Sequence, residues 1–513
     1  MTLSATIANS LWVTSSLAAW RRFRVALRHP AEIQRDWLRK HLAQNANCGF
    51  SRSHGLESVR NYADFARRVP LLDYERHKPW IERVRHGETQ VLTGAPVTHL
   101  IPTGGSTGAR KLIPFTPGLQ LDFNHAIGPW ICDLTFKHPG LLGGPAYWSI
   151  TPAAKAGLET STVPIGFDDD ASYLGGTRKW LVQAALVTPP KLRPVSDLDQ
   201  FRYETLLCLV RCRDLRLISV WHPSFLSLLL DALPACWEKL AGDSGGLREL
   251  RHADPLKPET IWPHLKVISC WGDAYAGIAL ADLRRRFPQT HIQPKGLLAT
   301  EAFVTIPFGG FHPVAVRSHF FEFIDEGGAM QLVHELRQGH TYEVVVTTSG
   351  GLWRYRLGDR VQVEGFIGKT PSLRFVGRNS AISDCCGEKL SEAFVDGVIS
   401  ELAKITGSIP RYALLAPDVD ATGIRYTLYW EGESPPKLTT RLDEMLRQNP
   451  NYAWSRDLGQ LKAPRLFRIR EEGYKDFVAY EMKRGRRLGE IKPVALSCDT
   501  GWSHRFSGDK MSL

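Results

Sequence analysis

Apolar and polar positions follow two rhythms along the chain, and each rhythm predicts a kind of element. Residues 20–74 have apolar positions three and four apart, which predicts helices. A further helix is predicted at 117–136, with an apolar face that includes Leu121, Ile127 and Ile131. Beyond it, short strand-like runs (PAYWSIT, DLRLISVW, HLKVISCWG, YEVVVTT) alternate with helical stretches (FLSLLLDALPACWEKL, GIALADLRRRF).

This alternation predicts an α/β fold with a largely parallel or mixed sheet. After residue 378 the pattern changes to RYALLAPD, IRYTLYWEG and PRLFRIR, which is typical of a small α+β unit. At 513 residues the chain is too long for one ordinary core. We therefore place a boundary at 378–380, between an N-terminal domain (1–378) and a C-terminal domain (379–513).

Composition and charge narrow the class of protein. Hydrophobic residues make up 43% of the chain and charged residues 23%, as in folded domains rather than disordered ones. The net charge of +11 would suit a nucleic-acid binder if the basic residues were clustered. The basic runs at 20–24, 284–286 and 483–487 are short, so we predict no nucleic-acid partner. A general attraction for anionic substrates stays open.

Cysteine usage and the N-terminal segment bear on location. Nine cysteines without a CxxC pair argue against a disulfide framework and against a structural zinc site. The stretch SLWVTSSLAAW has no basic residue before it and no cleavage signature after it, so an amphipathic helix is favoured over a signal peptide. No run of 18 apolar residues exists. We expect a cytoplasmic protein with no membrane partner.

Chemistry is suggested first by TGGSTGARK, residues 103–111. Three glycines let backbone N–H groups approach an anion, three hydroxyl side chains add donors, and Lys111 adds a charge. The stretch does not fit GxxxxGK[ST], because Lys111 follows Gly108 by three positions and no hydroxyl residue follows it. Two interpretations remain at this point: a phosphate-binding loop and a plain turn between strands.

Three later stretches add candidate residues. In 295–308, Thr300 and Glu301 end a short run, where the carboxylate can hold a divalent ion. In 343–366, Asp359 follows a glycine and can accept hydrogen bonds from a ribose diol. Arg378 lies at the predicted boundary. Taken singly, these residues also fit a surface carboxylate, a turn residue and half of an ion pair.

Their order along the chain resembles that of the adenylate-forming ligase superfamily, and more closely its GH3 branch of acyl acid amido synthetases. The matching stretches are TGGSTGARKLIPFT and YEVVVTTSGGLWRYRLGDRVQVEGF, and the likeness runs from Trp20 to Leu496. The stretches LLATE and YWSITP resemble the corresponding sequences of bacterial members of the family. The resemblance implies a two-domain ligase fold, with a large N-terminal α/β domain of mixed sheets and a small mobile C-terminal α+β domain.

The same resemblance assigns roles by position. ATP and a carboxylic acid would bind the N-terminal domain, and the C-terminal domain would carry a catalytic lysine, Lys492. Glu301 would be catalytic and would ligate Mg²⁺. ATP would contact a set of loop and strand-end residues: Thr103, Gly105, Ser106, Thr107, Gly108, Thr300, Asp359 and Arg378.

Some positions depart from the family or leave a choice. Lys462 competes with Lys492, although the distance from Arg484 and Gly485 favours Lys492. Gly104 stands where the family often has Ser, and Leu297 where plant members carry a Tyr beside the adenine. ISDCCGEKLSE replaces a different plant run, which weakens the assignment of roles to Glu388 or Lys389.

The resemblance implies an ATP-dependent ligase that adenylates a carboxylic acid and passes the acyl group to an amino acid or another amine. Adenylation is required because a carboxylate would otherwise have to expel oxide. Two alternatives remain open: a ligase that forms an acyl-CoA thioester, and a non-catalytic binding or regulatory protein. The acid pocket is expected to include Phe123, Ile127, Tyr147 and Trp148, although Phe123 and Trp148 fit a core equally well. The acid, the amine and the oligomeric state stay open.

Overall fold

The computed structural model describes most of the chain, namely residues 3–103, 111–148, 161–166, 184–187, 198–220, 223–245, 250, 252–273, 276–378, 382–383, 385–386, 388, 390–420, 423–433, 438–457, 460–484, 486 and 491–511. It divides into two compact units. The larger contains most of the chain up to Phe375, and the smaller contains chiefly Val376–Leu513, together with Asp273–Asp282. The boundary predicted at 378–380 falls among the first residues of the smaller unit.

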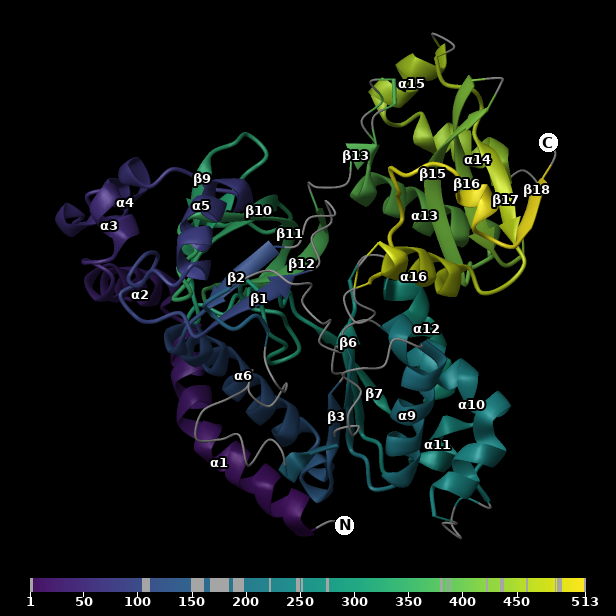
Figure 1. Cartoon of the computed structure of the whole chain (residues 1–513), viewed down its shortest axis with the longest axis horizontal. Helices are drawn as coiled ribbons and strands as arrows, with labels where there is room; N and C mark the ends of the chain where they lie inside the picture. Colours follow the sequence, from purple (N-terminus) through teal and green to yellow (C-terminus); the bar gives the residue numbers. More distant parts are fainter. Residues whose placement is uncertain are drawn as a thin grey trace. The chain divides into compact units, whose positions relative to one another are not determined.

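The larger unit begins with the helices that the sequence predicts, and polar caps mark their starts. The side chains of Asn61 and Asp73 accept the backbone N–H groups of Asp64 and Arg76, which fixes the first turns of two of them. The long first helix packs along α6 (Figure 1). The helices are α1 (Leu3–Ala26), α2 (Pro30–Gln44), α3 (Gly49–Ser53), η1 (Leu56–Ser58), α4 (Tyr62–Arg68), α5 (Tyr74–Arg85), α6 (Pro117–Lys137) and η2 (Pro139–Gly143).

A five-stranded parallel sheet forms the centre of this unit, in the order β4-β3-β5-β6-β7. Figure 1 shows α6 on one side of it and α9 and α10 on the other. Cover on both faces explains why its strands read as apolar runs. The elements are β3 (Ala146–Trp148), β4 (Leu186–Val187), α9 (Leu198–Arg211), β5 (Leu217–Ser219), α10 (Pro223–Asp243), α11 (Pro258–Ile261), β6 (Val267–Trp271) and β7 (His291–Lys295). Helix α12 (Ala276–Arg286) precedes β7, and its residues up to Asp282 belong to the smaller unit.

A second five-stranded sheet, in the order β12-β11-β10-β8-β9, and a separate two-stranded pair complete the larger unit. In this sheet β9 pairs with β8, β8 with β10 and β10 with β11, all antiparallel, and the pair β1–β2 is also antiparallel. The expected α/β fold with mixed sheets is thus confirmed. The elements are β1 (His99–Thr103), β2 (Lys111–Phe115), β8 (Phe320–Ile324), β9 (Met330–Leu332), η5 (Val333–Glu335), β10 (Thr341–Thr347), β11 (Tyr355–Ile367) and β12 (Thr370–Arg378).

The smaller unit is built on a four-stranded sheet, β15-β16-β17-β18, with a hydrophobic cluster on each face. Along β15, Ala413 and Leu415 belong to one cluster, whereas Tyr412 and Leu414 belong to the other. The continuous apolar run RYALLAPD is therefore a strand buried on both faces. The elements are β13 (Ile382–Ser383), β14 (Leu390–Ser391), α13 (Glu392–Thr406), β15 (Tyr412–Asp420), β16 (Gly423–Glu431), α14 (Leu438–Leu446), α15 (Pro450–Asp457), β17 (Arg465–Ile469), α16 (Gly473–Lys483), η7 (Trp502–His504) and β18 (Gly508–Met511).

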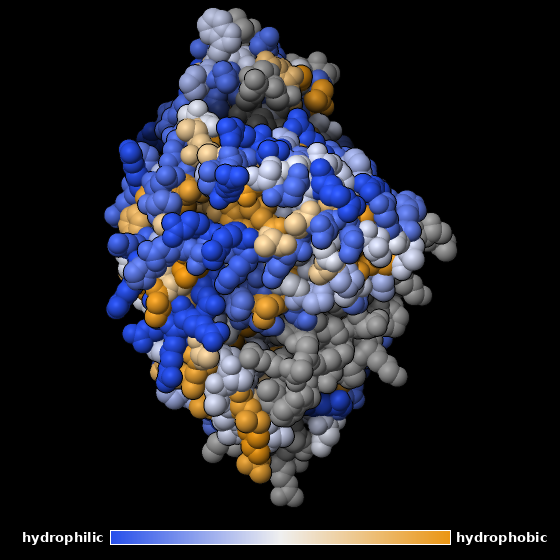
Figure 2. All heavy atoms as spheres, turned by 90° about the vertical axis from the view of Figure 1, so that its left-hand side faces the viewer, coloured by the Kyte–Doolittle hydropathy of each residue, from blue (hydrophilic) through white to orange (hydrophobic). Residues whose placement is uncertain are grey.

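The face that carries the first helices is mostly hydrophilic (Figure 2). Leu3, Ile7 and Leu11 are exposed on α1 and lie one helical turn apart. Within the described part of the chain, no helix is both long and apolar enough to cross a membrane.

Candidate functional site

The glycine-rich stretch connects two paired strands. β1 and β2 run antiparallel, and their last pair joins Thr103 to Lys111. Next to it, the N–H of Leu112 donates to the Tyr74 hydroxyl at 2.8 Å, and Lys111 Nζ lies 5.6 Å from the centre of the Tyr74 ring. The loop therefore has a firmly held base with a positive charge beside it. Gly104, Gly105, Ser106, Thr107 and Gly108 lie outside the described residues, so their phosphate contacts stay predictions.

Thr300 and Glu301 form the tip of a tight turn that follows β7. Leu298 and Phe303 pair antiparallel across it, and the N–H of Ala299 donates to the Ala302 carbonyl at 2.9 Å. Both tip residues are partly exposed, whereas Leu297 and residues 302–304 below them are buried. We call residues 297–305 the Glu301 hairpin. Its geometry presents one hydroxyl and one carboxylate on an apolar base.

A buried lysine that sequence reasoning had not singled out lies just before this hairpin. Lys295 ends β7, is almost fully buried, and its Nζ donates to the Val220 carbonyl at 2.9 Å. Burial raises the pKa of the Cys270 thiol to about 12, and the Lys295 charge acts in the opposite direction. Val220 directly follows β5, so this cation lies at the carboxyl edge of the parallel sheet, the usual place for ligands in open α/β sheets. The signal available in the sequence was its place at the start of the 295–308 stretch that carries Thr300 and Glu301.

Asp359 lies at an irregularity in β11. Glu343 pairs with Arg360 but Val345 pairs with Arg356, so three residues of β11 lie opposite the single residue between them. Gly358 has φ +76° within this bulge. Bulges re-aim side chains and are common beside active sites. Asp359 is fully buried, and its contact with a ribose stays a prediction.

The neighbouring WRYR residues have structural partners. Arg354 is buried, and its Nε and Nη2 donate to the fully buried Glu322 at 2.7–3.0 Å. The Trp353 Nε1 donates to the Leu92 carbonyl at 3.0 Å. Arg356 pairs with Glu343, which raises the pKa of that arginine. Arg378 ends β12, and its side chain lies outside the described part of the chain.

The four residues expected to line the acid pocket have mostly core surroundings. Phe123 and Ile127 on α6, and Tyr147 on β3, are buried. The Phe123 ring stacks on Phe303 with 4.2 Å between ring centres. Contact with an acid stays a prediction for all four, and these positions favour the packing alternative for Phe123.

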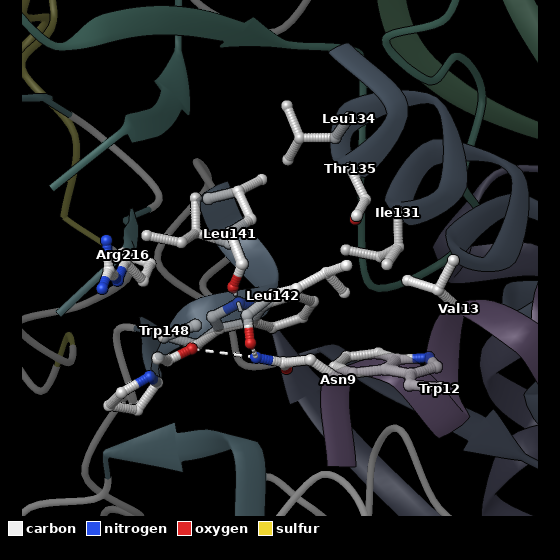
Figure 3. A pocket seen from close by; sticks show the side chains of 14 residues that line it. Asn9, Trp12, Val13, Ile131, Leu134, Thr135, Leu141, Leu142, Trp148 and Arg216 are labelled. Carbon is white, nitrogen blue, oxygen red and sulfur yellow. Dashed lines mark hydrogen bonds between the residues drawn. The ribbon is translucent and has the colours of Figure 1, made fainter. Parts of the chain in front are cut away.

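Trp148 lines an apolar pocket formed by α1, α6, η2 and the first residues of β3 and β5 (Figure 3). Its ring lies 6.2 Å from Trp12 and 6.0 Å from Trp130 between centres. The Asn9 amide closes one wall by donating to the Gly144 carbonyl at 2.8 Å. Ala146 and Leu217 line the pocket from the amino ends of their strands, which is the edge opposite to Lys295.

Both candidate lysines of the smaller unit are exposed. Lys492 lies between buried Ile491 and buried Pro493, and the Ile491 carbonyl accepts the Tyr474 hydroxyl at 3.0 Å. Lys462 is held at its backbone, where its N–H donates to the Ile424 carbonyl at 2.8 Å. The structure thus presents two lysines from anchored backbones, and the choice between them stays a prediction.

The described residues could bind Mg²⁺ only through one or two carboxylates, together with ligands from outside the protein. No group of three or more His, Cys, Asp and Glu side chains among them could hold a metal ion. Mg²⁺ is commonly bound by one or two carboxylates, with phosphate oxygens and waters completing its shell. A single partly exposed carboxylate such as Glu301 suits that arrangement.

Comparisons with family models, with curated proteins and with solved structures all find GH3 proteins. The GH3 family N-terminal domain matches residues 19–244, the GH3 family central domain residues 312–378 and the GH3 family C-terminal domain residues 394–500. A probable indole-3-acetic acid-amido synthetase, GH3.12 of Oryza sativa subsp. japonica, is 24% identical over 93% of this chain and 92% of its own length. The indole-3-acetic acid-amido synthetase GH3.3 of Arabidopsis thaliana is 23% identical over 93% and 91%.

A solved structure is also similar. The acyl acid amido synthetase AtGH3.15 in complex with 2,4-DB matches with a TM-score of 0.83 and 19% identity, over 95% of each chain. This likeness shows that the two chains share a fold.

Proposed function

The chain belongs to the GH3 family, and from this premise we propose that it is an ATP-dependent ligase joining a carboxylic acid to an amino acid or another amine. The carrying observation is the Glu301 hairpin, which presents a partly exposed carboxylate at the tip of a tight turn after the last strand of a parallel sheet. The amido synthetase relatives support the reaction class.

The proposed reaction has two steps. A carboxylate oxygen of the acid attacks the α-phosphorus of ATP, the new P–O bond forms, and pyrophosphate leaves. The amine nitrogen then attacks the acyl carbon, AMP leaves, and the amine loses a proton. Negative charge develops on the phosphates in the first step, and positive groups already in place stabilise it without reorganisation.

We propose these roles for the chain's own residues. Thr103 and the loop after it bind the ATP phosphates, with Lys111 nearby. Thr300 and Glu301 lie at the phosphates, where Glu301 ligates Mg²⁺. Asp359 binds the ribose hydroxyls, and Arg378 lies close to the ribose. Lys492 supplies the adenylating charge from the C-terminal domain (379–513), which moves against the N-terminal domain (1–378). Mg²⁺, when bound, neutralises phosphate charge.

The proposed partners are a small carboxylic acid and an amine, with no nucleic acid and no membrane. A cytoplasmic location is proposed because all nine cysteines are free thiols, which is usual in a reducing compartment.

Acid-dependent exchange of radioactive pyrophosphate into ATP, with a panel of aryl, indolyl and fatty acids, tests the first step. The product masses formed with an amine panel and with coenzyme A then test the second. Exchange with one acid class and an amide product are expected. A thioester product would favour the acyl-CoA alternative. If pyrophosphate exchange is absent and the protein binds DNA in an ATP-independent, salt-sensitive way, a regulatory protein would be favoured.

Lys492→Ala is the sharpest variant. Losing one charge that stabilises a transition state typically costs about 10² to 10³ in rate, so exchange should fall by that factor while the fold persists. Lys462→Ala is the matched control, because that lysine is also exposed on the smaller unit, and it should keep near wild-type exchange. The reverse result would move the role to Lys462.

A further inference from the structure

A side-chain acceptor from outside the Glu301 hairpin bonds to the base of its turn. The N–H of Phe303 donates to Nε2 of His319 at 3.2 Å. Phe303 is the residue that pairs with Leu298 at the base of the turn, and it is buried. A buried N–H without an acceptor costs about 1–3 kcal/mol, so the imidazole adds to the backbone hydrogen bonds that hold this turn in its present shape.

His319 is itself held rigidly. Its side chain is fully buried. Gln34 of α2, also buried, donates through Nε2 to the carbonyls of His319 and Val316, and its Oε1 accepts the N–H of Phe321, each at 2.7 Å. One glutamine therefore fixes the backbone on both sides of the histidine.

The bond to Phe303 also fixes the tautomer. Since Nε2 accepts, the neutral ring carries its hydrogen on Nδ1, and Nδ1 faces Oδ2 of the buried Asp122 at 3.9 Å. Burial lowers the pKa of His319 to about 3. At neutral pH the ring is therefore uncharged, and its Nε2 can accept the Phe303 N–H.

Aromatic contacts complete the support. Phe123 stacks on Phe303 at an interplanar angle of 10°, and its ring meets His319 edge to face with 5.8 Å between centres. Asp122 and Phe123 are consecutive on α6, so one turn of this helix contacts both His319 and the hairpin.

We propose that His319 is a positioning residue for adenylation: through its bond to the Phe303 N–H it sets the orientation of the Glu301 carboxylate toward Mg·ATP. This inference rests on the proposed role of Glu301. Residues that orient metal-binding groups from behind typically change metal affinity or activity by about 10- to 100-fold when lost.

A pair of variants separates this role from packing. Gln can place its Oε1 near the position of Nε2, whereas Asn offers a group only near Nδ1. We expect His319→Gln to keep its KM for Mg·ATP within about threefold of wild type. His319→Asn should raise that KM about 10-fold or more. The amide of Phe303 should exchange with deuterium faster in the Asn variant than in the Gln variant, measured without nucleotide.

His77→Asn is the matched control. His77 is equally buried, and its Nε2 accepts the Trp353 N–H at 3.1 Å, away from the hairpin sequence. The His77→Asn variant should lose about as much free energy of unfolding as His319→Asn does, and its KM for Mg·ATP should stay unchanged. Equal KM values in His319→Asn and His77→Asn would overturn the inference.

Two further results are informative. If the Asn variant does not fold, a Gln variant whose KM rises 10-fold despite normal Phe303 protection would also overturn it. Failure of the proposed function would look different, because the wild-type protein itself would then show no acid-dependent pyrophosphate exchange. The deuterium exchange rate of the Phe303 amide would still report on its bond to His319.

Discussion

Buried histidines accept backbone N–H groups in the larger unit, whereas a buried glutamate does so in the smaller unit. In the larger unit, His77 and His319 accept the N–H groups of Trp353 and Phe303. In the smaller unit, the buried Glu388 accepts the N–H groups of Cys385 and Cys386, both at 2.7 Å, and the Tyr426 hydroxyl. An imidazole accepts only while it is neutral, whereas a carboxylate accepts best while it is ionised.

This difference gives the units different responses to pH. Burial lowers the pKa of His41 and His319 to about 3 and of His77 to about 4. Burial alone would raise the pKa of Glu388, but its hydrogen bonds from Tyr426 and from backbone N–H groups bring it below the usual value. Between pH 7 and 5 these histidines therefore take up protons when the chain unfolds, whereas Glu388 stays ionised in the folded state.

The largest expected effect is acid destabilisation of the larger unit. The folded pKa values of these histidines lie below the unfolded value of 6.5, so the unfolded chain binds more protons and stability falls as pH drops below 6.5. Between pH 7 and 5 each contributes a loss of about 2 kcal/mol, about 6 kcal/mol for three. Asp122, whose pKa burial raises despite hydrogen bonds from Ser349 and Trp37, offsets part of it.

Deuterium exchange read by peptide mass spectrometry, corrected for the intrinsic rate at each pH, measures this difference. Peptides around His77 and His319 should lose protection at pH 5, while those of β15 and β16 keep theirs. Equal loss in both units would break the comparison.

The second prediction concerns Glu388→Ala. Removing the carboxylate takes the acceptor from the N–H groups of Cys385 and Cys386, whereas the Tyr426 hydroxyl can still donate to Ser383 Oγ. A buried donor without an acceptor costs about 1–3 kcal/mol, so we expect the free energy of unfolding of the smaller unit to fall by about 2 kcal/mol in urea titrations. Glu401→Ala is the control on α13, because Glu401 only forms an exposed pair with Lys404, and it should change stability by less than about 1 kcal/mol. Similar losses in the two variants would show that Glu388 is not the main acceptor.

The smallest expected effect comes from Asp396. Burial raises its pKa to about 6, and its Oδ1 has no hydrogen-bond partner among the described residues. A folded pKa above the unfolded value of 3.8 means that the smaller unit gains about 1 kcal/mol between pH 7 and 5. Asp396→Asn should remove this gain and raise stability at pH 7, because the amide carries no charge to bury. A variant that still gains stability on acidification would assign the effect to another group.

Part of the candidate site was accessible from the chain alone. The order of TGGSTGARK, LLATE, YRLGD and a late lysine indicated the family because short chemical motifs are local in sequence. Several of the strands and helices around them were predicted from the spacing of apolar and polar positions. Phe123 shows the limit: its apolar side chain fits a substrate pocket and a core equally, and only its stack on Phe303 favours the core.

Local patterns and short motifs therefore sufficed for the α/β class, for several of the strands and for the family, since these depend on residues close together in the chain. The tertiary structure alone decided which buried groups support the Glu301 hairpin. Gln34, Asp122 and His319 are far apart in the chain, and no local pattern marks a histidine as an acceptor for a distant N–H. That property arises only when folding removes water from around the pair and leaves each group as the other's partner.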